Sequence, residues 1–186
     1  LVFMQYYRGV QGDETDLPAP SVDTGMGLER ATMVVQQTPN IYATDLLEPL
    51  VNKAASLLGV TYGIKDDTDY AIRVVAEHGR AIPFLIADGV IPSNEGRGYV
   101  LRRIIRRAIR YGRWLANNET FLSGVVDETI HRFSALYPDL EINRDFITDT
   151  VVLEEDRFGR TIEFGMPLLE SGLIPLHLGI RGILKE

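Results

Sequence analysis

Cysteine is absent from this sequence of 186 residues, which excludes a disulfide framework and any thiolate metal site. The three histidines are far apart and have none of the spacings of metal ligands, so we expect each to be structural. No apolar run approaches the roughly 20 residues of a membrane span, and the N-terminal residues lack the basic start and apolar core of a signal peptide. These absences disfavour a membrane partner and are compatible with a reducing cytoplasm, where we expect the protein to reside.

The composition is that of an ordinary globular protein, with 45% hydrophobic and 24% charged residues. Apolar residues are spaced as in strands at 1–7 and 21–24, joined by a polar connection, and as in helices from residue 28 onward. The expected helices cover 28–37, 45–58, 71–88, 99–115, 120–137 and 144–169, the last with interruptions at Gly159 and Gly165. The pattern predicts an α+β fold that is predominantly α. The Gly- and Asp-rich segment 59–69 predicts a boundary between domains at 1–58 and 59–186.

A glycine pair, Gly25 and Gly27, lies between a strand-like and a helix-forming segment, and Arg30 follows three positions later. Glycines allow a tight turn and close approach of a ligand, and an arginine supplies a permanent charge suited to a nucleotide phosphate or base. The third glycine of a dinucleotide-binding fingerprint is missing, which disfavours a Rossmann fold. The pattern alone leaves a ligand site and a plain strand-to-helix turn equally open.

Positive charge is concentrated in one segment of a chain whose formal net charge is −7. Residues 97–113 hold seven arginines and no acidic residue, so the rest of the chain carries −14. On a helix at about 100° per residue, most of these arginines form a stripe opposite an apolar face. Their mutual repulsion has to be offset from outside the helix. Nucleic acid, acidic side chains elsewhere in the fold and an anionic membrane surface are the alternatives, in that order of preference.

Two motifs carry a resemblance to a known family. Residues 22–30 (Val-Asp-Thr-Gly-Met-Gly-Leu-Glu-Arg) resemble motif 3 of a class II aminoacyl-tRNA synthetase, in the form typical of the alanyl-tRNA synthetases. Residues 86–89 and 92–107 are similar to the signature of that family's tRNA-recognition region. The resemblance covers about residues 1–170. Residues 175–186 match no segment of the family, so we expect a truncated or altered sequence there.

The resemblance implies the edge of a class II antiparallel sheet, followed by a helical tRNA-recognition domain. It implies a ligase that activates alanine with ATP and Mg²⁺ to alanyl-adenylate and transfers the alanyl group to tRNA(Ala). Alanine, ATP and tRNA(Ala) are then the partners. Zinc belongs only to the family's editing domain, which we do not find in this sequence.

Motif 3 implies roles for individual residues of the first 30. Asp23 is similar to the aspartate that pairs with the ammonium group of alanine, and Asp23 and Arg30 are the implied catalytic residues. Gly25, Gly27 and Arg30 would contact ATP, while Gly25 and Val2 would border the alanine. Without the family, an aspartate before a glycine turn is more simply a turn stabiliser.

The second motif implies RNA contacts. Asn94 is similar to an asparagine that approaches the third base pair of the acceptor stem, the G·U pair that marks alanine tRNA, from its minor-groove side. A carboxamide can donate and accept hydrogen bonds in the wide, shallow minor groove of RNA, although Ser93 or Asn94 could simply cap a helix. The arginines assigned to tRNA are Arg97, Arg102, Arg103, Arg106, Arg107 and Arg110.

Family elements that are missing limit the expected activity. Motifs 1 and 2 and part of the alanine pocket would precede Leu1, and the oligomerising region and an aspartate-bearing segment that partners the asparagine are not found. We therefore expect a fragment of a ligase that is inactive by itself. The alternative is a non-catalytic RNA-binding module derived from the synthetase.

Overall fold

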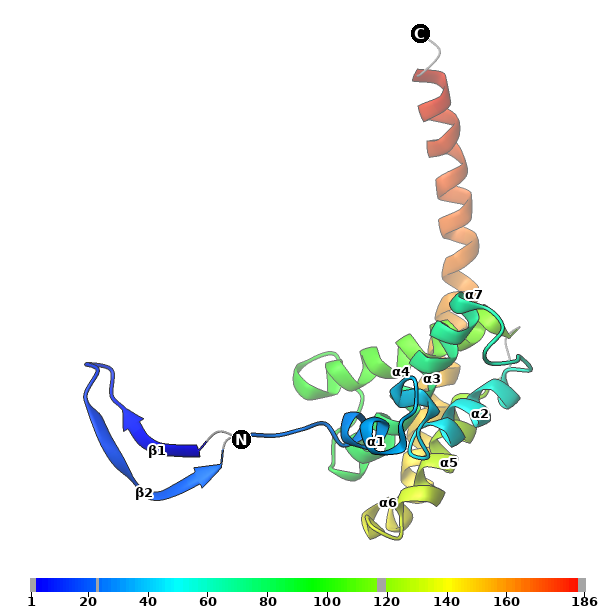
Figure 1. Ribbon diagram of the computed structural model, residues 1–186. Coiled ribbons are helices and arrows are strands. Elements are labelled where there is room, and N and C mark those ends of the chain that lie inside the picture. The colour runs from blue at the N-terminus through cyan, green and yellow to red at the C-terminus, as the bar shows by residue number, and fades with distance from the viewer. Residues whose placement is uncertain (1–2, 23, 117–119, 184–186) are drawn as a thin grey trace. The chain divides into compact units, whose positions relative to one another are not determined.

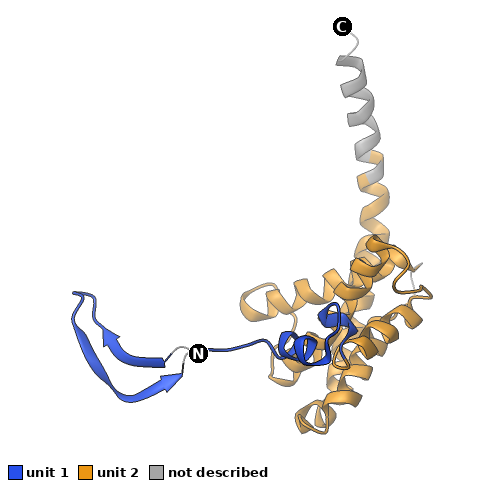
Figure 2. Cartoon of the chain, in the orientation of Figure 1, with its two compact units in different colours: residues 1–44 blue, residues 45–186 orange. Residues whose placement is uncertain are grey.

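The computed structural model describes residues 3–22, 24–116 and 120–183 (Figure 1). The chain divides into two compact units, residues 1–44 and 45–186 (Figure 2). The first unit contains the only sheet of the described residues, and the second is entirely helical there. The predicted α+β fold that is predominantly α is thus confirmed.

In the first unit, β1 (Phe3–Arg8) and β2 (Glu14–Val22) form an antiparallel hairpin. β2 is longer than the predicted 21–24 and includes two prolines of the expected connection, Pro18 and Pro20. The pairing register of the two strands shifts opposite these prolines, between Met4 and Tyr6. Each strand of a two-stranded sheet also has one unpaired edge, where the N–H that proline lacks would have no partner in the sheet. β2 can therefore include Pro18 and Pro20, although the sequence pattern favoured a loop at these positions.

The hairpin is followed by α1 (Leu28–Gln36) and a short 3-10 helix, η1 (Ile41–Ala43), which pack against each other. α1 ends at Gln37, whose φ of 54° places it in the left-handed region. The Asn40 side chain accepts a hydrogen bond from Tyr42 N at 3.0 Å and so caps η1. The extent of α1 is close to the predicted 28–37.

The second unit contains α2 (Glu48–Leu57), α3 (Asp66–Ala87), α4 (Gly96–Leu115), α5 (Leu122–Phe133), α6 (Pro138–Ile142) and α7 (Arg144–Ile183). α3 is central and contacts each of the other five helices. Its apolar side meets that of α4, where Leu101, Ile105 and Ile109 are fully buried. Because α2 packs on α3 and α5, the division between compact units falls after Thr44, whereas the predicted domain boundary lies after residue 58.

The helices differ from the sequence prediction in several places, and the differences at α3, α6 and α7 are the most informative. α3 begins at Asp66 rather than 71, because Asp66, Asp67 and Asp69 in its first turn favour the positive end of the helix dipole. α6 was not predicted and begins with a proline, which is favourable at that position. α7 continues through Gly159 and Gly165. Gly159 is covered by the Arg113 side chain, so tertiary packing offsets the low helix propensity of glycine there.

A buried carboxylate fixes the start of α5. Glu155 of α7 is fully buried and accepts hydrogen bonds from the backbone N–H groups of Phe121 and Leu122 at 3.2 to 3.4 Å. Burial raises the pKa of this carboxyl above its ordinary value, against the lowering effect of those hydrogen bonds and of Arg113. Glu155 thereby ties α7 to α5 beside the end of α4.

We expect Gly112→Ala to destabilise the second unit by about 1–3 kcal/mol, because a Cβ at this buried position would overlap the ring of Phe121. The midpoint of urea unfolding, followed by helical circular dichroism, measures the change. Gly165→Ala is the matched control, since no described atom lies within 4 Å of a Cβ there, and it should leave stability unchanged or raise it by up to about 1 kcal/mol. Equal midpoints for the two variants would contradict close packing of α4 on Phe121.

Candidate functional site

Helix α4 has an apolar face and an arginine-rich face, as its spacing predicted. Its buried residues are Gly98, Leu101, Ile105, Ala108, Ile109 and Gly112, which meet the core. Six of the seven arginines of residues 97–113 lie on the opposite side of the helix, Arg102, Arg103, Arg106, Arg107, Arg110 and Arg113, and this segment has no acidic residue. Because the apolar face of α4 is packed in the core, the arginine-rich face has a defined orientation.

Three arginines of this helix pair with acidic residues of α7. The Nε atoms of Arg102 and Arg106 lie 3.2 Å and 2.7 Å from one carboxylate oxygen of Glu154, whose side chain is only 3% exposed. Arg113 lies 3.7 Å from Glu163. Acidic side chains elsewhere in the fold therefore offset part of the repulsion, as one of the sequence-based alternatives expected.

Four arginines remain exposed on the same helix: Arg97, Arg103, Arg107 and Arg110. The guanidinium groups of Arg103 and Arg107 lie 5.8 Å from the ring centres of Tyr99 and Tyr111. Arg107 also donates a hydrogen bond to the Tyr70 hydroxyl at 3.2 Å. Contacts with aromatic rings restrain a guanidinium and leave other N–H groups free to bind an anion.

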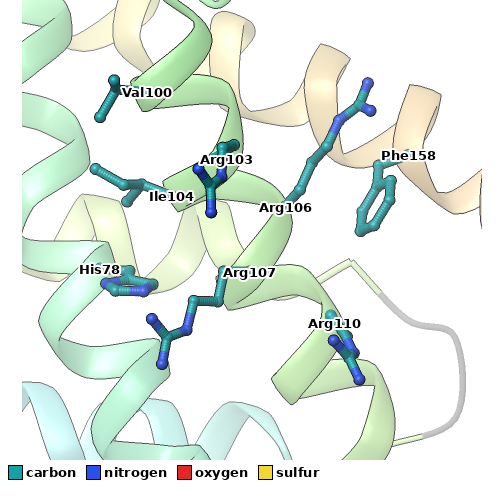
Figure 3. Close-up of a pocket in the computed structure, with 8 residues that line it drawn as sticks. All are labelled: His78, Val100, Arg103, Ile104, Arg106, Arg107, Arg110 and Phe158. Carbon is teal, nitrogen blue, oxygen red and sulfur yellow. The ribbon is translucent and has the colours of Figure 1, made fainter.

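Arg103, Arg107 and Arg110, together with Arg106, border a groove of about 450 Å³ between α3, α4 and α7 (Figure 3). The lining residues are His78, Val100, Arg103, Ile104, Arg106, Arg107, Arg110 and Phe158. The Arg106 guanidinium lies over the Phe158 ring at 5.1 Å. Burial, reinforced by the charge of Arg107, lowers the pKa of His78 and so favours its neutral form, and the arginines provide the positive charge of the groove.

The loop before α4 holds Asn94 at the surface. Arg102 donates a hydrogen bond to Asn94 Oδ1. Ser93 N donates to the Gly98 carbonyl at 3.1 Å, and the Ser93 hydroxyl donates to the Glu95 carbonyl at 2.8 Å. The N-cap residue of α4 is Glu95, without a side-chain capping bond, so capping of α4 by Asn94 is not observed.

The nucleotide motif of the first unit is only partly described. Val2 and Asp23 lie outside the described residues. Gly27 is the N-cap of α1, and Arg30 lies exposed in the first turn. Neither Gly25 nor Gly27 has a positive φ, so the turn itself does not require glycine. No described atom lies within 4 Å of a Cβ placed on Gly25, which leaves room for the close approach of a ligand.

Sequence reasoning missed Glu154, His78 and Phe158 as parts of the site. They come from α7 and α3, and no local motif marks them. Among the described residues, no cluster of three or more His, Asp or Glu could hold a metal ion. None of the described helices is both long and apolar enough to cross a membrane.

Comparison with known proteins identifies the family. The family model described as tRNA synthetases class II (A) matches residues 1–177. The alanine–tRNA ligase of Dehalococcoides mccartyi is 48% identical over 171 residues, which are 92% of this chain and 20% of that relative. The corresponding ligase of Lawsonia intracellularis is 47% identical over 173 residues, 93% of this chain and 20% of the relative.

A third relative, the alanine–tRNA ligase of Nitratidesulfovibrio vulgaris, is 47% identical over 176 residues. These make up 95% of this chain and 20% of the relative, so the chain spans a fifth of the length of the curated relatives that it matches. Identity near one half along almost the whole chain agrees with both sequence motifs. The chain belongs to the class II (A) family of tRNA synthetases.

Proposed function

We propose that this chain is part of an alanine–tRNA ligase and that its helical unit binds the acceptor stem of tRNA(Ala). The observation that carries the proposal is that one helix, α4, both lines an arginine-rich groove and contacts the loop of Asn94. Arg102 of α4 donates a hydrogen bond to Asn94, so the helix that carries the cationic groove also holds the carboxamide in place. Phosphate contacts fix the position of a nucleic acid, and a side chain at the base edges can then distinguish the sequence.

The six arginines assigned to tRNA have two different environments. Arg97, Arg103, Arg107 and Arg110 are exposed and suited to direct phosphate contacts. Arg102 and Arg106 are half-buried against Glu154. A guanidinium has five N–H donors, so an arginine paired on one edge can still donate to a phosphate from another.

The first unit would contribute to activation of alanine. Arg30 would bind ATP, with Gly25 and Gly27 allowing the nucleotide to approach the backbone, and Asp23 would pair with the ammonium group of alanine. The exposed N-terminus of α1 and Arg30 both favour negative charge. Mg²⁺ would enter with the ATP phosphates as part of the substrate. Positioning and charge stabilisation are what such a reaction requires from the protein.

The chain alone would not carry out this reaction, because motifs 1 and 2 of the family are not found in it. Its place would then be between the remaining parts of a cytoplasmic ligase, with the zinc-bearing editing domain elsewhere. A non-catalytic RNA-binding module is the second candidate. The two differ in whether the reading frame upstream of Leu1 encodes motifs 1 and 2.

We expect Asn94→Ala to lower the preference of the chain for an acceptor-stem RNA hairpin with G·U at the third base pair over the same hairpin with G·C. The lost contact is a hydrogen bond to a base edge, for which discrimination of about 1–3 kcal/mol is typical, or roughly 5- to 150-fold. Competition binding at one salt concentration gives the ratio of the two dissociation constants. An unchanged ratio would contradict the assignment of Asn94 to this base pair.

A further inference from the structure

A second and larger cavity adjoins the arginine groove and is formed by the same three helices, α3, α4 and α7. Its volume is about 910 Å³. Arg110 and Phe158, both labelled in Figure 3, line the groove and this cavity alike, so the two are continuous at these side chains. α7 also contributes Ile162, Met166 and Leu169 to the wall of the cavity. A ligand whose charged part lies in the groove can therefore extend an uncharged part into this cavity.

Three aromatic side chains of α3 and α4 also line this cavity: Tyr70, Tyr111 and Trp114. Trp114 is 59% exposed, although tryptophan is highly buried on average, and Tyr70 is exposed as well. Exposed aromatic side chains gathered in a concave site are typical of binding sites. Their rings are available to a planar ligand.

The two tyrosines are restrained by their neighbours. The Tyr70 hydroxyl accepts a hydrogen bond from Arg107 at 3.2 Å, and its ring meets that of Tyr111 edge to face, with the ring centres 5.6 Å apart. The Arg107 guanidinium also lies 5.8 Å from the centre of the Tyr111 ring. Because Arg107 restrains both rings, a ligand that stacks on them loses little affinity to ordering these side chains.

We propose that this aromatic cavity binds an unpaired nucleobase of an RNA whose phosphates lie in the arginine groove. Proteins hold single-stranded nucleic acid with aromatic side chains beside a cationic groove, because every base has a face to stack and every nucleotide carries a phosphate. Arg110, which lines both cavities, would contact the phosphate that precedes the unpaired base. This inference rests on the proposed function for RNA binding by the groove. It adds a second binding site and its class of ligand, an unpaired base.

The polar lining of the cavity indicates which bases fit best. Among the described residues that line it, Asp67 is the only acidic one. A carboxylate only accepts hydrogen bonds, and the amino group of adenine, guanine or cytosine can donate to it. Uracil has no amino group, and its one N–H lies between two carbonyl oxygens that a carboxylate repels. We therefore expect adenine to bind more tightly than uracil.

The first test compares two acceptor-stem hairpins that differ only in a single-stranded 3′ extension. One extension contains adenine nucleotides, and the other is abasic and has the same length and phosphates. We expect the adenine extension to lower the dissociation constant at least about 5-fold relative to the abasic one, as is typical of stacking one base on an aromatic side chain. Equal dissociation constants for the two hairpins would overturn the proposal.

Trp114→Ala tests the stacking ring directly. We expect the ratio of dissociation constants for the abasic and adenine extensions to fall toward one, while the affinity for a hairpin without an extension stays unchanged. Phe164→Ala is the matched control, because Phe164 is an aromatic residue of α7 that is 76% exposed and does not line the cavity. It should leave the ratio unchanged. A ratio that Trp114→Ala does not alter would overturn the proposal.

Asp67→Ala tests the base preference. We expect it to reduce the preference for an adenine extension over a uracil extension of the same length. Asp66→Ala is the matched control, since Asp66 lies in the same first turn of α3 and does not line the cavity. An unchanged preference in Asp67→Ala would overturn the assignment of this carboxylate.

A free nucleotide is another source of the same chemistry. Trp114 is the only tryptophan of the chain, so its fluorescence reports on the cavity. Adenosine monophosphate at the concentration of the hairpins should leave this fluorescence unchanged, because a single phosphate has few contacts in the groove, whereas the adenine extension should alter it. A free nucleotide that binds as tightly as the extended hairpin would overturn the assignment to RNA.

The two proposals fail in different ways. If none of the hairpins binds, RNA binding by the groove is wrong, and the proposal for the cavity falls with it. If the hairpin without an extension binds but the bases of an extension add nothing, the proposed function stands and only the cavity is wrongly assigned.

Discussion

The affinity of this chain for an acceptor-stem RNA hairpin is expected to fall about 100-fold when monovalent salt is raised from about 50 to 200 mM. Arg97, Arg103, Arg107 and Arg110 are exposed, and we propose that they neutralise phosphates. Each contact releases close to one counterion, so the slope of log K against log salt is about −3 to −4. The measurement is fluorescence anisotropy of a labelled hairpin over a salt series.

Changing Arg103, Arg107 and Arg110 together to glutamine should reduce that slope by about 3 and weaken binding to the G·U and G·C hairpins alike. Arg132→Gln is the matched control, because Arg132 lies on α5 and pairs with Glu128 at 2.6 Å. A salt dependence that is flat in the unaltered chain would mean that internal ion pairs, not phosphates, balance the arginine face.

The arginine face of α4 could be predicted because it is determined by the spacing of residues within one segment of the sequence. Residues spaced at helical intervals along one segment define both faces of α4, whatever packs against them. Glu154, the residue that pairs with Arg102 and Arg106, could not be predicted. It lies 48 residues beyond Arg106, and only the packing of α7 on α4 brings it there.

The groove could not be predicted from the sequence either. His78 and Phe158 line it beside the arginines, yet each looks like an ordinary helical residue in sequence. The extent of the elements was also set by context: the hairpin tolerates Pro18 and Pro20 because its register shifts beside them. Local pattern thus predicted the helices and the charge, whereas the contacts that orient Asn94 depend on the tertiary fold.

In a complete ligase containing this sequence, Arg30→Ala is expected to reduce alanine-dependent pyrophosphate exchange at least about 100-fold, the effect typical of losing one charge-stabilising donor at a reacting centre. Arg30 lies in the first turn of α1, its side chain is in contact range of Gly27, and it is exposed in this chain. Asp23→Ala should cause a comparable loss, because we propose that Asp23 pairs with the ammonium group of alanine. Exchange of radiolabelled pyrophosphate into ATP measures this step without tRNA.

Two comparisons separate a role of Arg30 in ATP binding from a general loss of structure. Arg132→Ala removes an exposed arginine of α5 and should leave exchange unchanged. RNA binding should also be unchanged in Arg30→Ala, because the groove and the loop of Asn94 belong to the other compact unit. Exchange near the unaltered rate in both Arg30→Ala and Asp23→Ala would remove activation of alanine from this motif. A parallel loss of exchange and RNA binding would instead show that Arg30 supports the fold.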